Sequence, residues 1–436
     1  TLDYVRLQDE TNNDISIYTD ELKELGFRTE FEVQSNVDIT PPSIHSLEIS
    51  AYQFDVTNSD ATFTILTHLT DDLSGLSDSN GYLANFVWRS PSQTQVVEAA
   101  ISPYDLVAGS LTDGYFDDVI TIPQYSEQGT WTLDYINASD AIGNSLDIYK
   151  IYDGNYVTEG VDENGNYIEK LIDLDFKTEF EVISLNPDTT APEFKNLEVS
   201  EDIFDVNDGD KTFNLTANLT DDISGFIGDN QVNGSYIDLT WSSPSSSQYV
   251  YASMGAYMYY SYEPEWQDVI INVDDNNISF ENIEVTIPQY SEPGTWTLQE
   301  IYATDSIGNR LDIYRDYDGN YVTNGVDENG NYIQKLVDLD FKTEFEVISS
   351  NPDTTAPEFK NLEVSKDIFD VTDGDKTFEL TVNLTDDLSG IRNQYVDFSW
   401  RSPSGEDSIH TQYSNNDEPL LSGPQAILPD VEPGGS

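Results

Sequence analysis

The stretch Asp188-Thr-Thr-Ala-Pro-Glu-Phe-Lys-Asn-Leu-Glu-Val-Ser200 returns unchanged at residues 353–365, and this repetition decides the fold. A looser copy begins at Asp38 and contains Pro41-Pro42. A segment that returns at long intervals is typical of a chain that uses one structural unit several times. We therefore expect a tandem array of similar domains.

Further landmarks follow this stretch in a fixed order. A Thr-Asp-Asp-x-Ser-Gly box comes first, then Trp-x-Ser-Pro, then Ile-Pro-Gln-Tyr-Ser-Glu-x-Gly-Thr-Trp-Thr-Leu, then an Ile-Gly-Asn turn, and finally Phe-Lys-Thr-Glu-Phe-Glu-Val or its Arg variant. Their shared order indicates one unit copied along the chain. The copies of each motif, with the motifs in the order just given, begin at Thr70, Thr220 and Thr385; Trp88, Trp241 and Trp400; Ile122 and Ile287; Ile142 and Ile307; and Phe27, Phe176 and Phe341.

Apolar and polar residues alternate between these landmarks, as in Phe213-Asn-Leu-Thr-Ala-Asn-Leu219. A period of two over about seven residues predicts a strand with one buried face. Gly, Asn, Asp and Pro separate the runs at turn spacing. Helical periodicity is nearly absent, apart from one possible short turn at residues 20–25. Seven or more strands per unit around a buried Trp predict an all-β fold of β-sandwiches.

These motifs resemble bacterial extracellular immunoglobulin-like tandem repeats, which are marked by a Thr-x-Ala-Pro opening, an Asp-x-x-Ser-Gly box and an Asp-x-x-Gly-Asn turn. The resemblance covers essentially the whole chain. It implies calcium-binding, cadherin-like modules of stalks, adhesins and surface layers, located outside the cell or on its surface. It implies no single activity.

The repeat phase divides the chain into two complete immunoglobulin-like domains and two half-domains. Residues 38–187 and 188–352 are the complete domains, residues 1–37 match the end of a unit, and residues 353–436 match its beginning. Joining Ser436 to Thr1 restores the repeat. We expect each C-terminal half to be completed by the N-terminal strands of a neighbouring molecule, which gives a head-to-tail homopolymer. Alternatively, the chain is an excerpt of a longer covalent stalk.

Charge narrows the possible partners of this 436-residue chain. Its formal net charge is −64, from 82 Asp and Glu against 18 Lys and Arg. Such a field repels nucleic acid and anionic membranes, and no apolar run is long enough for membrane insertion. Aromatic residues make up 12% and hydrophobic residues 37%, which argues against a disordered acidic chain. Without Cys, no disulfide can form, and metal ions are the usual substitute.

Acidic residues recur at the linker, at the box and at the Ile-Gly-Asn turn, which should meet at one pole of each sandwich. Several oxygen ligands from separate loops suit Ca²⁺. An ion at the joint with the preceding domain would stiffen the linker. The alternative is that these residues only cap turns. The candidate ligands are Asp38, Asp71, Asp72, Asp140 and Asn144; Asp188, Asp221, Asp222, Asp305 and Asn309; and Asp353, Asp386 and Asp387.

A second calcium candidate is Asp316-Tyr-Asp318-Gly-Asn320, which looks like half of a calcium loop. The acidic residue expected at the twelfth position of an EF-hand is replaced by the shorter Asp327, and the preceding unit has Ile151 in place of Asp316. A β-hairpin with Asp-Gly and Asn-Gly turns is the favoured alternative.

Signals for chemistry are absent. The chain shows no catalytic triad, phosphate loop or metalloprotease motif around His45, His68 or His410, so we expect no enzyme. The tract from Tyr249 to Trp266 could bind glycans by stacking, although alternating Tyr is also ordinary strand surface. We expect a structural subunit of an extracellular filament or surface stalk, stabilised by calcium. A glycan-binding adhesin, excerpted from a giant cell-surface repeat protein, is the alternative.

Overall fold

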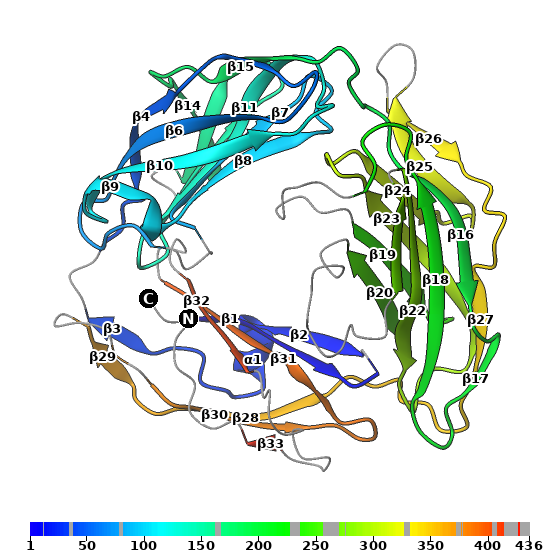
Figure 1. Ribbon diagram of the computed structural model, residues 1–436. Helices are drawn as coiled ribbons and strands as arrows, with labels where there is room; N and C mark the ends of the chain where they lie inside the picture. Colours follow the sequence, from blue (N-terminus) through cyan, green and yellow to red (C-terminus); the bar gives the residue numbers. More distant parts are fainter. Residues whose placement is uncertain are drawn as a thin grey trace.

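The chain is almost entirely β in the computed structural model, as the sequence predicts (Figure 1). The only helices among the described residues are the short α1 (Thr19–Glu24) and the 3₁₀ turn Pro103–Asp105. The structure describes residues 1–436 except 12, 35–37, 78–81, 162–166, 227–235, 256–269, 275, 327–331, 372–375, 377, 403–407, 414–425 and 428–436.

The alternating sequence runs form strands with one buried face. In β18 (Lys211–Thr220), Phe213, Leu215 and Leu219 are buried, while the polar residues between them face outward. β6 (Ala61–Thr70) shows the same pattern. Since the side-chain period of a strand is two, this register places every apolar residue of the run in the core.

The first sandwich consists of two facing sheets and takes up the strands from β4 to β15. Its smaller sheet has the order β4-β6-β10-β9, from β4 (Ser43–Ile49), β6, β10 (Asp113–Ile122) and β9 (Leu106–Gly109). In the larger sheet, β11 pairs β7 on one side and β15 and β12 on the other. This sheet comprises β5 (Gln53–Asp55), β7 (Ala84–Arg89), β8 (Val96–Ile101), β11 (Gly129–Ser139), β12 (Ser145–Lys150), β13 (Tyr156–Val161), β14 (Tyr167–Ile172) and β15 (Glu179–Ile183).

The second sandwich repeats this topology with the strands from β16 to β27. Its smaller sheet has the order β16-β18-β22-β21, from β16 (Glu193–Val199), β18, β22 (Asn277–Ile287) and β21 (Ile270–Asp274). The larger sheet comprises β17 (Ile203–Asp205), β19 (Tyr236–Ser242), β20 (Tyr249–Gly255), β23 (Gly294–Thr304), β24 (Arg310–Arg315), β25 (Tyr321–Val326), β26 (Tyr332–Leu336) and β27 (Glu344–Ile348).

A third, composite sandwich is assembled from both ends of the chain. Its sheets have the orders β28-β30-β33, β2-β1-β31-β32 and β29-β3. The C-terminal part supplies β28 (Glu358–Val364), β29 (Ile368–Asp370), β30 (Leu380–Thr385), β31 (Ile391–Arg401), β32 (Ser408–Tyr413) and β33 (Ala426–Ile427). The N-terminal part supplies β1 (Leu2–Asp9), β2 (Asp14–Tyr18) and β3 (Glu32–Gln34).

The pairing of the two chain ends is formed within one molecule. β1 pairs antiparallel with β31, with Leu2 opposite Trp400 and Val5 opposite Phe398, and β3 pairs parallel with β29. The sequence led us to expect the same strand partners from a neighbouring molecule. The structure therefore supplies the partner in cis, and exchange between molecules stays a prediction.

Each sandwich has its own hydrophobic core, built around a Trp from the Trp-x-Ser-Pro motif. Trp88, Trp241 and Trp400 are each at most 2% exposed. The composite core joins Leu2, Val5 and other N-terminal residues to the C-terminal strands. The three sandwiches lie around a common centre, and the N-terminal strand β1 lies within the composite sandwich (Figure 1).

Candidate metal sites at the sandwich poles

The acidic loops of each sandwich meet at one end, here called its pole. The pole of the second sandwich contains Asp188 from the linker before β16, Asp221 and Asp222 after β18, and the Asp305–Asn309 turn after β23. The Ser306 N–H donates to the Gly225 carbonyl at 2.9 Å, which ties this turn to the box loop. Ala141 with Gly75, and Glu10 with Gly390, make the equivalent bond in the other sandwiches.

Carboxylate oxygens of Asp188, Asp221 and Asp222 lie within 4.8 Å of one another. The linker fixes Asp188, because its Oδ1 accepts from the Thr190 N–H at 3.0 Å and its Oδ2 from the Ser224 N–H at 2.9 Å. The Thr190 hydroxyl also donates to Asp222 Oδ1 at 2.6 Å. Backbone N–H groups of the two loops therefore hold Asp188, and the Thr190 hydroxyl holds Asp222 beside it.

The box loop holds Asp221 by one oxygen only. Asp221 Oδ2 accepts from the N–H groups of Ile223 at 3.1 Å and Gly225 at 2.7 Å. Gly225 has a φ of +73°, a left-handed conformation that favours glycine and lets its N–H turn back to the carboxylate. Asp221 Oδ1 is buried and has no hydrogen-bond partner among the described residues.

The first sandwich repeats this geometry. Oxygens of Asp38, Asp71 and Asp72 lie within 4.8 Å of one another. Asp71 Oδ2 accepts from the Gly75 N–H at 2.6 Å, and Asp38 Oδ2 accepts from the Ser74 N–H at 2.8 Å. Asp71 Oδ1 is again buried without a partner in the described part of the chain. The arrangement is therefore a property of the repeat.

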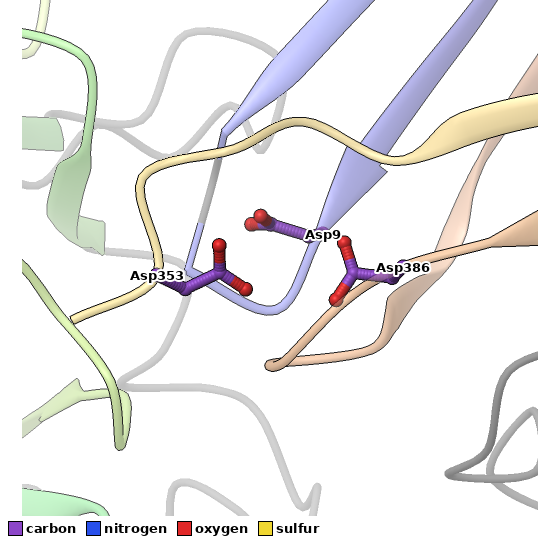
Figure 2. Close-up of side chains that lie close together, drawn as sticks. All are labelled: Asp9, Asp353 and Asp386. Carbon is purple, nitrogen blue, oxygen red and sulfur yellow. The ribbon is translucent and has the colours of Figure 1, made fainter. Parts of the chain in front are cut away.

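In the composite sandwich, Asp9 of the N-terminal half joins Asp353 and Asp386 of the C-terminal half (Figure 2). Oxygens of these three acids lie within 4.8 Å of one another. The sequence analysis included Asp353, Asp386 and Asp387 but missed Asp9. Aligning Thr1 with Thr297 puts Asp9 at the position of Asp305, so the signal was present.

Asp387 has a supporting place in the composite pole, where its Oδ1 accepts from the Thr355 hydroxyl. The box loop repeats its hold on Asp386, whose Oδ2 accepts from the Gly390 N–H at 2.7 Å. Asp386 Oδ1 has no partner among the residues that the structure describes. The equivalent carboxylate oxygen, Oδ1 of the first box aspartate, is therefore unpaired at each of the three poles.

The third element of each pole is a closed Asp-x-x-x-Asn turn. Asp305 Oδ1 accepts from the N–H groups of Ile307 at 3.0 Å and Asn309 at 2.9 Å, and its Oδ2 accepts from Asn309 Nδ2 at 2.7 Å. Asp140 with Asn144, and Asp9 with Asn13, form the same turn. Asp140 and Asp305 are brought to the pole as expected, but only Asp9 belongs to a three-carboxylate group.

Burial raises the pKa of several pole carboxyls. Desolvation raises the pKa of Asp305 to about 7, against the hydrogen bonds from Asn309, and Asp188 adds repulsion. Desolvation likewise raises the pKa of Asp9 to about 7. The pKa of Asp221 is raised first by burial and then by the charges of Asp188 and Asp222. Carboxylates are thus crowded where burial removes much of their hydration, and a bound cation would offset their mutual repulsion.

The donor set of the poles fits calcium. The candidate ligands are all oxygens, which hard cations such as Ca²⁺ prefer, and they come from separate loops, which suits its flexible geometry. A buried carboxylate oxygen without a partner is rare in folded proteins, because desolvation then goes uncompensated. The equivalent oxygen is left unpaired at all three poles among the described residues, and a bound cation would satisfy it, which turn capping does not.

The second calcium candidate forms the hairpin that the sequence favoured. β24 pairs β25, and Asp316 Oδ1 accepts from the N–H groups of Asp318 at 2.9 Å and Asn320 at 2.8 Å. Among the described residues, no third acidic side chain joins this turn in a compact group. The turn explains these residues structurally, and calcium at this position stays a prediction.

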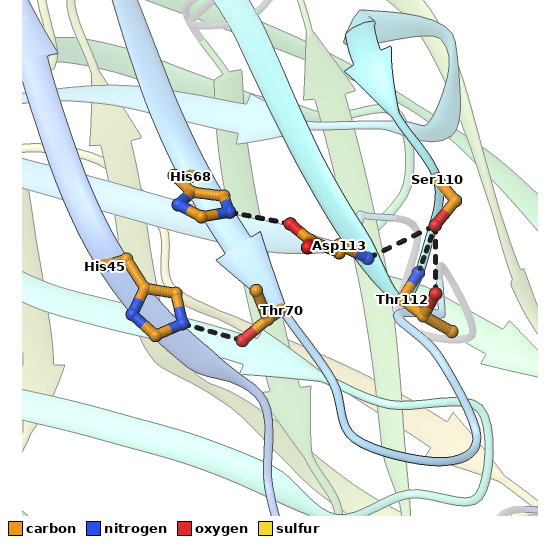
Figure 3. A network of polar contacts seen from close by, with 6 residues as sticks. All are labelled: His45, His68, Thr70, Ser110, Thr112 and Asp113. Carbon is orange, nitrogen blue, oxygen red and sulfur yellow. Dashed lines mark hydrogen bonds and ion pairs between the residues drawn. The ribbon is translucent and has the colours of Figure 1, made fainter.

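Two of the three His residues lie on the smaller sheet of the first sandwich (Figure 3). His68 stacks on Tyr115 at 4.2 Å and its Nε2 lies 2.8 Å from Asp113 Oδ1, while His45 Nε2 lies 2.8 Å from Thr70 Oγ1. These contacts join the neighbouring strands β4, β6 and β10 of one sheet, and His45 and His68 are replaced by Lys195 and Asn218 in the second sandwich.

The Tyr-rich tract is described only at its start. Tyr249 and Tyr251 lie on β20 with their rings 6.2 Å apart, and Tyr251 is 59% exposed. The rest of the predicted platform, Tyr257, Tyr259, Tyr260, Tyr262 and Trp266, lies outside the described residues.

No protein-family model matches the chain, and no curated protein matches it either. Within the described residues, no helix has the length and apolar character needed to cross a membrane.

Proposed function

We propose that the chain is a structural segment of an extracellular filament or surface stalk, built from immunoglobulin-like repeats whose poles bind calcium. The observation that carries the proposal is the unpaired buried oxygen of Asp71, Asp221 and Asp386, which recurs at the same place in three acidic poles. A site repeated in every sandwich, beside the linker to the preceding one, suits a mechanical role better than a single reaction.

Calcium would act on both the fold and the linkers. Asp38, Asp188 and Asp353 belong to the linkers, whereas Asp71, Asp221 and Asp386 belong to the box loops. An ion shared by the two segments would hold the linker against the sandwich and offset part of the −64 charge. The linker would then transmit force instead of bending.

Assembly by strand exchange is the second part of the proposal. The contacts between β1 and β31 in one chain are available equally to β1 of a neighbour, which would give a head-to-tail, heterologous polymer. The closed chain is favoured when dilute, because the two ends are held at high effective concentration. Exchange therefore needs high protein concentration or opening of the composite sandwich.

The experiment that tests the proposal is thermal unfolding in millimolar Ca²⁺, in Mg²⁺ and in EDTA at matched ionic strength. We expect a clear rise of the melting temperature in Ca²⁺, because a ligand that binds only the native state stabilises it by about 2.7 kcal/mol at a hundredfold excess over Kd. Mg²⁺ should substitute poorly, since it demands a stricter octahedron. Identical melting curves in Ca²⁺ and EDTA would contradict the proposal.

The control variant is Glu48→Gln, which removes one charge from the exposed face of β4. We expect it to keep the full calcium effect, whereas Asp221→Asn weakens it.

Glycan binding remains the alternative function, favoured by the exposed ring of Tyr251. Its test is a broad glycan array with the wild-type chain and Tyr251→Ala. Retention that depends on Tyr251 would support an adhesin, and no signal from the wild-type chain would remove it.

A further inference from the structure

A buried glutamine crosses the joint between the first and second sandwiches. Gln95 follows β7 and is 1% exposed. Its Oε1 accepts from the Glu127 N–H of its own sandwich at 2.7 Å. Its Nε2 donates to the Asp188 carbonyl at 2.6 Å and to Asn309 Oδ1 at 2.9 Å, both in the pole of the next sandwich. The carboxamide oxygen thereby holds Gln95 to its own sandwich, while both bonds from its nitrogen cross the joint.

The second joint uses the same atoms. Gln248 is fully buried, its Oε1 accepts from the Glu292 N–H at 2.7 Å, and its Nε2 donates to the Asp353 carbonyl at 2.5 Å and to Asn13 Oδ1 at 3.2 Å. The amide orientation is determined, because a backbone N–H can only donate and a backbone carbonyl can only accept.

One backbone bond accompanies the glutamine at each joint. The Asp188 N–H donates to the Tyr125 carbonyl at 2.8 Å, and the Asp353 N–H donates to the Tyr290 carbonyl at 2.7 Å. The amide and carbonyl groups of one pole residue are thus both held by the preceding sandwich. Two joints that share the glutamine bonds and this backbone bond indicate that the repeat encodes one fixed orientation.

The pole of the first sandwich has the same receptor, but none of the described residues donates to it. Asn144 is 2% exposed, yet its Oδ1 has no hydrogen-bond partner among the described residues. Asn309 and Asn13 use this atom to accept from a glutamine. In sequence, Gln95 and Gln248 stand seven positions after Trp88 and Trp241, and the residue seven positions after Trp400 is Asp407. A carboxylate has no N–H to donate.

We propose that the carboxamide of Gln95 and Gln248 is the coupling that fixes each sandwich against the pole of the next, and that the receptor formed by Asn144 and the Asp38 carbonyl fits the same glutamine-bearing loop. The coupling deepens the proposed function, on which it rests, because Asp188 and Asp353 supply both the receptor carbonyl and candidate calcium ligands. We expect the joint between the composite and first sandwiches to lack this coupling, because the sequence carries Asp407 where the glutamine of the other two repeats stands.

The test measures distances between spin labels across single joints. The chain has no Cys, so two introduced Cys residues are the only label sites. Tyr152→Cys and Tyr317→Cys place labels on fully exposed positions of the first and second sandwiches. The variants replace Gln95 and Gln248 together by Glu or by Met, because closure of the composite sandwich also restrains the first joint.

We expect both pairs of substitutions to broaden the distance distribution about twofold, as when a rigid joint becomes a short flexible linker. The matched control replaces the exposed Gln53 and Gln334 by Glu and should leave the distribution unchanged. Conversely, Asp407→Gln should narrow the distribution between labels at Leu25→Cys and Tyr152→Cys. Unchanged distributions in both the Glu and Met variants would overturn the coupling.

The Met variants keep the experiment decisive if Glu prevents folding, since Met has nearly the same shape without a charge. If Asp407→Gln does not narrow the distance distribution between the labels at Leu25→Cys and Tyr152→Cys, the claim about the Asn144 receptor is overturned. These readouts are separate from the calcium-dependent melting temperature. A rigid joint without calcium stabilisation would support the coupling while rejecting the proposed calcium role.

Discussion

The second and composite sandwiches share one framework but differ in how the chain supplies it. In the second, Tyr236 and Thr304, which meet near the start of β19, are 68 positions apart. In the composite, Tyr4 and Asp397 meet across 393 positions. Closing the longer loop costs about 1.6 kcal/mol more in an unfolded chain. Core and pole form in both cases, so the repeat tolerates a break in the chain, and we expect the composite sandwich to be the less stable of the two.

The pole makes the same point. Asp305 and Asp9 each form the closed Asp-x-x-x-Asn turn, and burial raises the pKa of both to about 7. Yet Asp305 reaches its pole from the same stretch of chain, while Asp9 comes from the opposite end. Side-chain chemistry at the pole therefore depends on the loops and not on the connectivity behind them.

Deleting residues 1–37 should have the largest effect, because it removes half of the composite sandwich and leaves the second sandwich complete. The composite core loses Leu2, Val5, Leu7 and Leu22, and the edge of β31 loses its partner. We expect amide protection to vanish from β28–β32 and to stay intact in the first and second sandwiches, measured by hydrogen exchange. This is the loss of a whole domain's stability, on the order of 5–15 kcal/mol.

A synthetic peptide of residues 1–37 should restore that protection in the deletion variant. Recovery shows that the N-terminal strands can be supplied by another molecule, as strand exchange requires. Protection of β31 that survives the deletion would contradict the composite sandwich.

The pH dependence of calcium-free stability sharpens the comparison. A folded Asp305 or Asp9 with a pKa of about 7 holds a proton that the unfolded chain, with an Asp pKa near 3.8, has lost. The free energy of unfolding in EDTA should therefore rise as pH falls from 8 towards 5, and this gain is lost as pH rises through 7. Thermal melts in 0.5 M salt, which screens the overall charge, measure it.

The control for this prediction is the pair Asp305→Asn and Asp9→Asn. Each should flatten the pH profile of its own sandwich, since the titrating group is gone. Profiles as steep as that of the wild-type chain would mean that carboxyl groups other than Asp305 and Asp9 determine the pH dependence of stability.

Much of the fold follows from sequence because the repeat has strong local signals. Alternation over Phe213 to Leu219 sets both strand and buried face, and the short helical turn at residues 20–25 corresponds to α1 (Thr19–Glu24). Loop acids could also be grouped, because the linker, box and turn recur together. The unpaired oxygen of Asp221 could not be predicted, because the burial and the hydrogen-bond partners of a single atom depend on the folded structure.

Gln95 and Gln248 were missed for a different reason. A glutamine in a Ser-rich turn reads as ordinary loop, and only the joint reveals that it reaches into the next sandwich. The sequence shows that each glutamine stands seven residues after a Trp, but this spacing indicates a role only once the pole of the next sandwich is seen beside it. Likewise, cis pairing of β1 with β31 depends on how the sandwiches are arranged in space, which no local pattern encodes.

The most direct test of the central claim is a count of bound calcium by equilibrium dialysis at physiological salt. The account predicts three saturable ions per chain, one for each acidic pole. Asp71→Asn, Asp221→Asn and Asp386→Asn should each remove one ion, while Glu48→Gln removes none. Weak, unsaturable binding that none of these pole substitutions changes would contradict the account, because the acids would then act only as a diffuse negative surface.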